Sequence, residues 1–165
     1  WLSVKDTSRK YKIIKIVNDS IITIDNSDLF KDQHLVVGAM GIDDALWIYS
    51  FIGLIKFDGT YFEHITQNEG LTFDRCINLL ADKSGTVWVN GSKAGLNIHR
   101  EGVINFTGSP DFDQVESIFS DSQRRVWLDI RYKGLFSFDG SDLYKYNILP
   151  KENYKVNEIL EDANG

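Results

Sequence analysis

Three histidines and one cysteine are the residues of this sequence that most often bind metals or act as nucleophiles. His34, His64 and His99 are separated by 64 − 34 = 30 and 99 − 64 = 35 residues, so they fall in different parts of the chain. Zinc ligands usually come in closely spaced pairs. We therefore expect no metal site and no cofactor.

Cys76 stands at the same position in its segment as Val115 and Val156 in theirs. This match predicts a small buried hydrophobic residue rather than a nucleophile. A single cysteine cannot form an internal disulfide, so the sequence leaves the redox compartment open. The chain also has no glycine-rich phosphate loop, no GxSxG elbow and no HExxH pair. We expect this segment not to be an enzyme.

Three aspartates recur at nearly equal intervals. Asp121 follows Asp82 by 121 − 82 = 39 residues, and Asp162 follows Asp121 by 162 − 121 = 41. Such a set could bind calcium or supply an acid–base pair. Each one, however, opens a short polar turn such as "ADKSG", in which Asp bonds its own backbone and Gly85 takes a positive φ. The recurrence therefore predicts local backbone capping.

The aspartates belong to a longer repeat. Trp88 follows Trp47 by 88 − 47 = 41 residues, and Trp127 follows Trp88 by 127 − 88 = 39. A Gly-Leu pair comes after each tryptophan, beginning at Gly53, Gly95 and Gly134. The glycine should allow a backbone conformation or a close approach that a side chain would block.

Each repeat predicts four short strands. Short apolar runs are bounded by turn residues, and the 3.6-residue period of a helix is not seen. The order is a strand before the aspartate turn, a strand carrying the tryptophan, a strand beginning at Gly-Leu, and a strand after a second tight turn such as "FDGT". Arg124 stands where Gly85 stands, so the geometry of that turn is less certain from sequence. Locally joined strands form one antiparallel meander per repeat.

A four-stranded meander that repeats every 40 to 45 residues is the expected blade of a β-propeller. Helical repeats and leucine-rich repeats have other periods. We predict an all-β, partial propeller over residues 1–165, with units at about 1–46, 47–87, 88–126 and 127–165. In the degenerate first unit, Trp1 stands at a tryptophan position and the Gly-Leu pair is missing. The tryptophans should fill the wedge between neighbouring blades.

The composition limits the partners of the chain. A net charge of −6 argues against a surface that follows phosphates, so we expect no nucleic acid. With 42% hydrophobic residues the chain can bury a substantial core, and no apolar run approaches the roughly 18 residues of a membrane helix. Trp1 does not open a signal peptide.

The spelled-out repeat resembles the two-component regulator propeller repeat. The elements that carry the resemblance are "CINLLADKSGTVWVNGSKAGLNIHREGVINFT" and "VESIFSDSQRRVWLDIRYKGLFSFDGSDLYKYN", and it covers about residues 35–165. The departures are Asp44 and Arg124 for the turn glycine, Gly41 for the turn aspartate, and His99 for an aromatic residue.

The resemblance implies the periplasmic sensor region of a hybrid two-component sensor histidine kinase, typical of gut Bacteroidetes, whose propellers recognise glycan fragments. It also implies partners: the remaining blades, a downstream sensor domain, a second subunit in a homodimer, and a kinase elsewhere in the full-length protein. The ligand implied is an oligosaccharide.

The loops divide into two populations. The aspartate turns and "DG" turns are short and regular, whereas the other loops are longer and differ in every copy. Because the strands alternate in direction, the longer loops should lie together at the end opposite to the short turns. Binding residues concentrate on such loops. Aromatic rings would cover a sugar face, and polar groups would bond its hydroxyls. The candidates are Tyr49, Phe51, Arg75, Asn90, Lys93, Asp113, Asp129, Arg131, Tyr132 and Lys133.

Two other functions stay open at this point. A propeller lyase or hydrolase would need an acid–base pair that converges on the channel. A protein-interaction scaffold without a small ligand would show an apolar, uncharged patch across the loop end. For each single candidate residue, the alternative is an ordinary solvated loop side chain.

Overall fold

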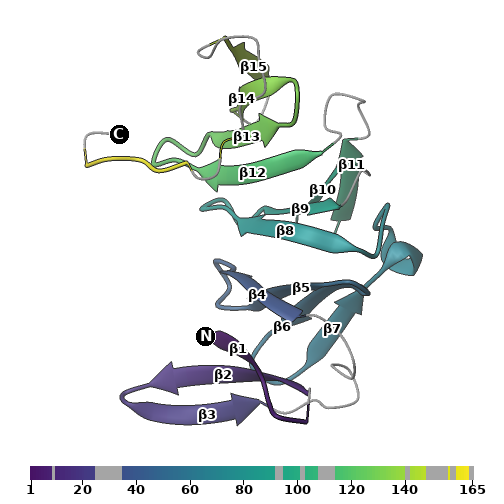
Figure 1. Cartoon of the computed structure of the whole chain (residues 1–165), viewed down its shortest axis with the longest axis vertical. Coiled ribbons are helices and arrows are strands. Elements are labelled where there is room, and N and C mark those ends of the chain that lie inside the picture. Colours follow the sequence, from purple (N-terminus) through teal and green to yellow (C-terminus); the bar gives the residue numbers. More distant parts are fainter. Residues whose placement is uncertain are drawn as a thin grey trace.

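Figure 1 shows the computed structural model, in which four antiparallel sheets stack along the long axis in chain order. The structure describes residues 1–8, 10–24, 35–91, 95–100, 103–107, 114–139, 142–147, 156 and 159–163, and the side chains of 35–37 and 103–107 are not described. In this part of the chain the regular elements are strands and one short 3-10 turn, Gln67–Glu69. No helix in these ranges is long and apolar enough to cross a membrane.

Each sheet is a meander of consecutive strands. The first sheet contains β1 (Leu2–Lys5), β2 (Tyr11–Val17) and β3 (Ser20–Ile24). The second contains β4 (Leu35–Met40), β5 (Leu46–Ser50), β6 (Gly53–Phe57) and β7 (Phe62–Ile65). The third contains β8 (Cys76–Ala81), β9 (Val87–Gly91), β10 (Leu96–Arg100) and β11 (Val103–Thr107), and the fourth contains β12 (Val115–Ser120), β13 (Val126–Ile130), β14 (Gly134–Phe138) and β15 (Leu143–Tyr146).

This arrangement confirms the all-β class and the four-stranded meander. The repeat tryptophans lie in the second strand of their sheets, so a unit counted from tryptophan to tryptophan spans parts of two sheets. The division into blades at those limits stays a prediction.

The aspartate turns confirm the expected backbone capping. Asp82 Oδ1 accepts hydrogen bonds from the Ser84 and Thr86 amides, and Asp82 Oδ2 accepts one from Trp88 Nε1 at 2.8 Å. Asp121 accepts the equivalent bonds from Arg125 N and Trp127 Nε1. The turn geometry is the same in all three copies, with or without glycine, because the residue at the glycine position has a positive φ each time: Asp44 (59°), Gly85 (84°) and Arg124 (67°).

The Gly-Leu glycines also behave as expected. Gly53, Gly95 and Gly134 have φ values of 134°, 83° and 107°, a region that L side chains rarely adopt. A Cβ at Gly53 would in addition lie 2.5 Å from the carbonyl oxygen of Ile65 on β7. Both the conformation and the close approach therefore require glycine there.

A ladder of rings joins the sheets. The tryptophan of one sheet contacts a ring at the end of the third strand of the next sheet: Trp1 with Phe57 (6.1 Å between centroids), Trp47 with His99 (5.0 Å) and Trp88 with Phe138 (5.6 Å). The wedge role predicted for the tryptophans is confirmed, and Trp1 shares it. His99 takes the aromatic position of its repeat.

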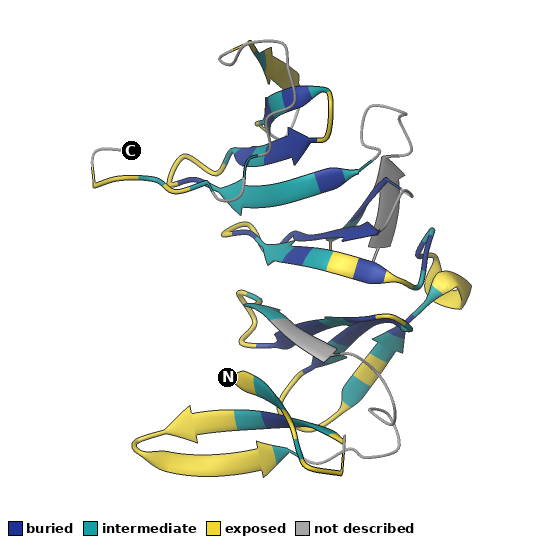
Figure 2. Cartoon of the chain, in the orientation of Figure 1, coloured by how far each residue is buried: buried dark blue, intermediate teal, exposed yellow. Residues whose placement is uncertain are grey.

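The core lies between the sheets. One apolar cluster joins the first and second sheets around Ile13 and Ile48, one joins the second and third around Trp47 and Cys76, and a third joins the third and fourth sheets. Figure 2 shows the buried residues concentrated along these faces, whereas the β2–β3 hairpin is mostly exposed. The sheets are therefore held mainly by contacts with their neighbours.

Candidate functional site

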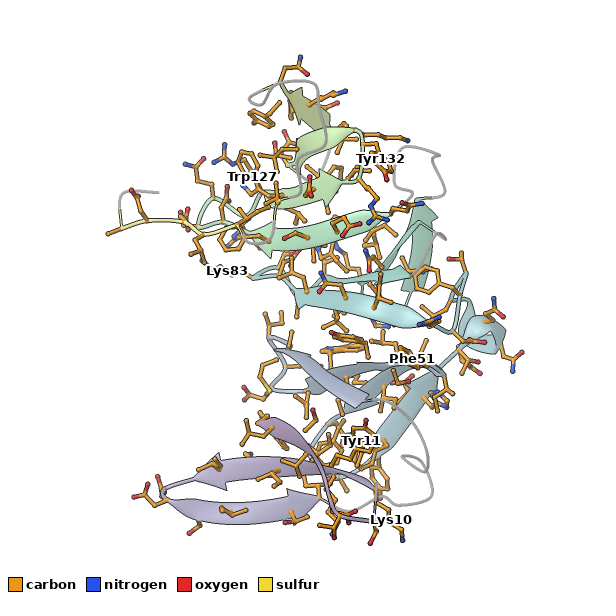
Figure 3. All side chains as sticks on the ribbon, in the orientation of Figure 1. Lys10, Tyr11, Phe51, Lys83, Trp127 and Tyr132 are labelled. Carbon is orange, nitrogen blue, oxygen red and sulfur yellow. The ribbon has the colours of Figure 1, made fainter. Side chains whose placement is uncertain are left out.

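The loops at the two ends of the strands differ. In the orientation of Figure 1, the β4–β5, β8–β9 and β12–β13 turns lie on the left, and the β5–β6 and β13–β14 loops lie on the right. Figure 3 places Lys83, from an aspartate turn, at the left end, and Phe51 and Tyr132 at the right. We call the right-hand end, formed by residues 51–52, 66–75 and 131–133, the loop end. This division agrees with the expectation from strand alternation.

Phe51 and Arg75 meet at the loop end. Phe51 lies between β5 and β6 and is 44% exposed, and Arg75 precedes β8. The Arg75 guanidinium carbon lies 4.6 Å from the centre of the Phe51 ring, within the range of a cation–π contact. Two loops from different sheets thus present one exposed ring with a cation against it.

A second pair has the same composition. Tyr132, on the β13–β14 loop, is 84% exposed, and the guanidinium of Arg131 lies 5.7 Å from its ring centre. Arg131 Nε also bonds Glu116 Oε1 at 2.9 Å. Tyr132 has a φ of 63°, and Lys133 N closes the turn on Ile130 O at 2.9 Å. A bulky residue in this left-handed region stores strain, a feature that clusters at functional sites.

Two further candidates are buried and do not lie on the loop surface. Asn90 and Asp129 are 1% and 2% exposed, each two residues after its repeat tryptophan. Asn90 Nδ2 donates to the carbonyl oxygen of Val115, and Asp129 Oδ2 accepts the amide of Val156 at 3.2 Å. Both side chains therefore reach the equivalent backbone position, one repeat further along the chain. A ligand role for either stays a prediction.

The remaining candidates are Tyr49, Lys133, Lys93 and Asp113. Tyr49 is half-buried against the cluster between the second and third sheets, and burial raises the pKa of its phenol. Lys133 is partly buried beside Tyr132. Lys93 and Asp113 lie outside the described residues. Of the ten candidates, the structure groups Phe51 with Arg75 and Arg131 with Tyr132 and Lys133, and these two groups stand on different sheets.

Sequence reasoning missed a cavity between the third and fourth sheets. Its volume is about 210 Å³, and its walls come from β8, β9, the start of β12 and the β13–β14 loop: Ile77, Asn78, Gly91, Gln114, Val115, Glu116 and Arg131. The strand register shifts between Cys76 and Asn78 and again between Val115 and Ser117, so β8 and β12 carry a bulge at equivalent positions. Bulges redirect side chains and recur next to functional sites. No residue type in the sequence announces them.

The cysteine and the histidines do not come together in the described part of the chain. Burial, together with the charge of Asp74, raises the pKa of the Cys76 thiol to about 12, and Cys76 is fully buried as expected. His64 lies on β7 and bonds Ile52 O through Nε2 at 3.0 Å, whereas His99 lies on β10 against Trp47. His34 is outside the described residues. In these ranges, no group of three His, Cys, Asp or Glu residues could hold a metal ion.

Comparisons with known proteins bear on the fold. No family model matches the sequence, and no curated protein matches it. Among solved structures, the chain is similar to the extracellular domain of the hybrid two component system BT3049 from B. thetaiotaomicron, with a TM-score of 0.59 and 18% identity, over 88% of this chain and 22% of that one.

Two structures of the extracellular domain of BT4673 from the same organism, described once as a hybrid and once as a one component system, give TM-scores of 0.39 and 0.38 at 14% identity. They cover 92% and 89% of this chain and 29% of each of theirs. The chain thus spans less than a third of the length of these structures. It has the fold of a segment of the extracellular domain of a two-component system.

Proposed function

We propose that this chain is part of the periplasmic sensor region of a hybrid two-component sensor histidine kinase, and that its loop end binds an oligosaccharide. The observation that carries the proposal is the pair of exposed rings, Phe51 and Tyr132, each with an arginine against it, on the loop end. Aromatic rings cover the apolar face of a sugar, and guanidinium groups donate to its hydroxyls.

The charges at the loop end favour a sugar over a protein scaffold. Arg75, Arg131 and Glu116 stand among the rings, whereas a scaffold surface would be apolar and largely uncharged. The fold shared with an extracellular domain supports the periplasmic location and a non-enzymatic role for this segment.

Signalling requires that the ligand bind two arrangements with different affinity. Phe51 and Tyr132 stand on different sheets, so a ligand that bridges them would favour one packing of the sheets. In our proposal that change is transmitted through the remaining blades and a downstream domain to a homodimeric kinase.

The test is calorimetry of the intact periplasmic region against a panel of host and dietary oligosaccharides. We expect one class to bind, and the Arg131→Ala/Tyr132→Ala variant to weaken that binding at least tenfold, equivalent to about 1.4 kcal/mol. Tyr61→Ala is the matched control, because Tyr61 is 75% exposed in a "DG" turn away from the loop end. Absence of heat from the whole panel would refute the proposal.

A further inference from the structure

We propose that the cavity between the third and fourth sheets binds a single uncharged sugar ring of the ligand. The inference rests on the proposed function and gives it a place and a ligand class. The cavity lies where the bulges of β8 and β12 meet the β13–β14 loop, so it adjoins the Arg131–Tyr132 pair.

The walls of the cavity provide both hydrogen-bond donors and acceptors. Asn78 and Gln114, which carry amide side chains, line the cavity from two sheets together with Glu116 and Arg131, and Asn78 Oδ1 already accepts the Leu79 amide at 2.8 Å. Amides can donate and accept, as sugar hydroxyls do. Ile77 adds an apolar surface that is 40% exposed. This mixture of a few polar groups with an apolar wall is typical of small-molecule sites.

The charge of the cavity favours a neutral ligand. Arg131 Nε is 2.9 Å from Glu116 Oε1, so the positive charge is already compensated by a carboxylate in the same wall. An anionic sugar would meet the Glu116 carboxylate and would have to compete with it for the guanidinium. A neutral hydroxyl group can bond to the pair without separating it.

Asn90 does not line the cavity, but it contacts a residue that does. Its Nδ2 donates to Val115 O, and both Val115 and the adjacent Gly91 line the cavity. Within the described ranges, Asn90 Oδ1 is buried without a hydrogen-bond partner. Buried acceptors are normally satisfied, so a hydroxyl or acetamido N–H supplied from the cavity would complete this group.

The size of the cavity limits the ligand to one ring. Its volume of about 210 Å³ is below the roughly 300–1,000 Å³ that holds a drug-sized molecule. The next sugar of a chain would then lie outside, against the exposed ring of Tyr132. This places one ring in the cavity and the rest of the ligand on the loop end.

The experiment titrates the intact periplasmic region with three probes: methyl glucoside, methyl N-acetylglucosaminide and methyl glucuronide. We expect at least one neutral glycoside to bind and the glucuronide to bind at least tenfold more weakly. Ile77→Trp should abolish binding by filling the cavity. Glu116→Gln should reduce or reverse the preference for neutral glycosides over the glucuronide, because it leaves the positive charge of Arg131 without its carboxylate partner. Glu63→Gln, at an exposed position on β7, is the matched control.

The outcomes separate this inference from the proposed function. Failure of all three glycosides, equal binding by Ile77→Trp, or a wild-type preference for the glucuronide overturns the cavity site even when longer oligosaccharides bind the loop end. Circular dichroism and the urea midpoint verify folding of each variant, and Ile77→Phe replaces Ile77→Trp if that variant does not fold. Absence of binding by every oligosaccharide refutes the proposed function itself.

Discussion

Replacing two equivalent tryptophans by phenylalanine isolates the aspartate–indole hydrogen bond of the repeat. Trp47 and Trp88 are both 3% exposed, and each contacts a ring of the next sheet. They differ at the turn, because Trp88 Nε1 donates to Asp82 Oδ2 at 2.8 Å, whereas the position equivalent to Asp82 is Gly41 in the repeat of Trp47. The two Trp→Phe changes therefore remove similar volume but only one of them removes this bond.

The expected difference follows from the burial of the carboxylate. Asp82 is 8% exposed, and its Oδ2 atom loses the indole donor in Trp88→Phe. Hydrogen bonds to charged groups contribute about 1.5–3 kcal/mol to stability, and a buried acceptor left without a donor carries a similar penalty. Trp88→Phe should therefore reduce the free energy of unfolding by about 1.5–3 kcal/mol more than Trp47→Phe does.

Urea unfolding followed by far-UV circular dichroism measures the difference without relying on the fluorescence of the replaced residue. The turn of Trp47 has no room for the aspartate as it stands, because a Cβ at residue 41 would lie 3.0 Å from Trp47 Nε1 and 2.5 Å from Asp43 Oδ1. The reasoning is refuted when Trp47→Phe costs as much as Trp88→Phe.

Three further outcomes are expected in the same unfolding assay. Arg124→Gly should raise the free energy of unfolding by up to about 1 kcal/mol, because glycine adopts the positive φ of this position without strain. Gln123→Gly in the same turn should lower the free energy of unfolding by a similar amount. A lower free energy of unfolding in both variants would contradict the turn geometry. Gly53→Ala should destabilise more than Gly59→Ala, because a Cβ meets Ile65 O at the first site and nothing within 4 Å at the second; equal effects would argue against the close approach. Burial lowers the pKa of His99, so the folded state binds its proton less readily than the unfolded state, and the stability due to neutral His99 should be present above about pH 6.5 and fall as the pH drops towards the lowered pKa. His99→Phe should remove that acid dependence, and an unchanged pH profile would show that another group causes it.

The sequence predicts the sheets and the joints between them because their causes are periodic. Trp88 recurs with its turn aspartate and its Gly-Leu pair, and each of these has one physical role that any copy reveals. Asn90 shows the limit of this reasoning. The sequence groups it with the variable loops, although it lies two residues from Trp88 on one strand, and alternation puts both side chains on the face that packs against the next sheet.

The cavity could not be predicted for a different reason. It depends on register shifts beside Ile77 and Glu116, and a one-residue shift in pairing follows from how two strands settle against each other, with no characteristic residue type. The ion pair between Glu116 and Arg131 likewise joins residues from separate strands.

The ring ladder gives the stack a polarity. Every joint runs from a tryptophan in one sheet to a ring in the following sheet, so the two outermost faces are unlike. On one of them, Trp127 borders a hollow of about 420 Å³. On the other, Ile16 is 53% exposed. Ile16 stands at the position of Phe57, because Lys15 lies over Trp1 as Lys56 lies over Trp47. Twofold symmetry pairs a surface with itself, so a twofold contact between two copies cannot repeat the tryptophan-to-ring contact that joins the sheets. A neighbour added head to tail can repeat it.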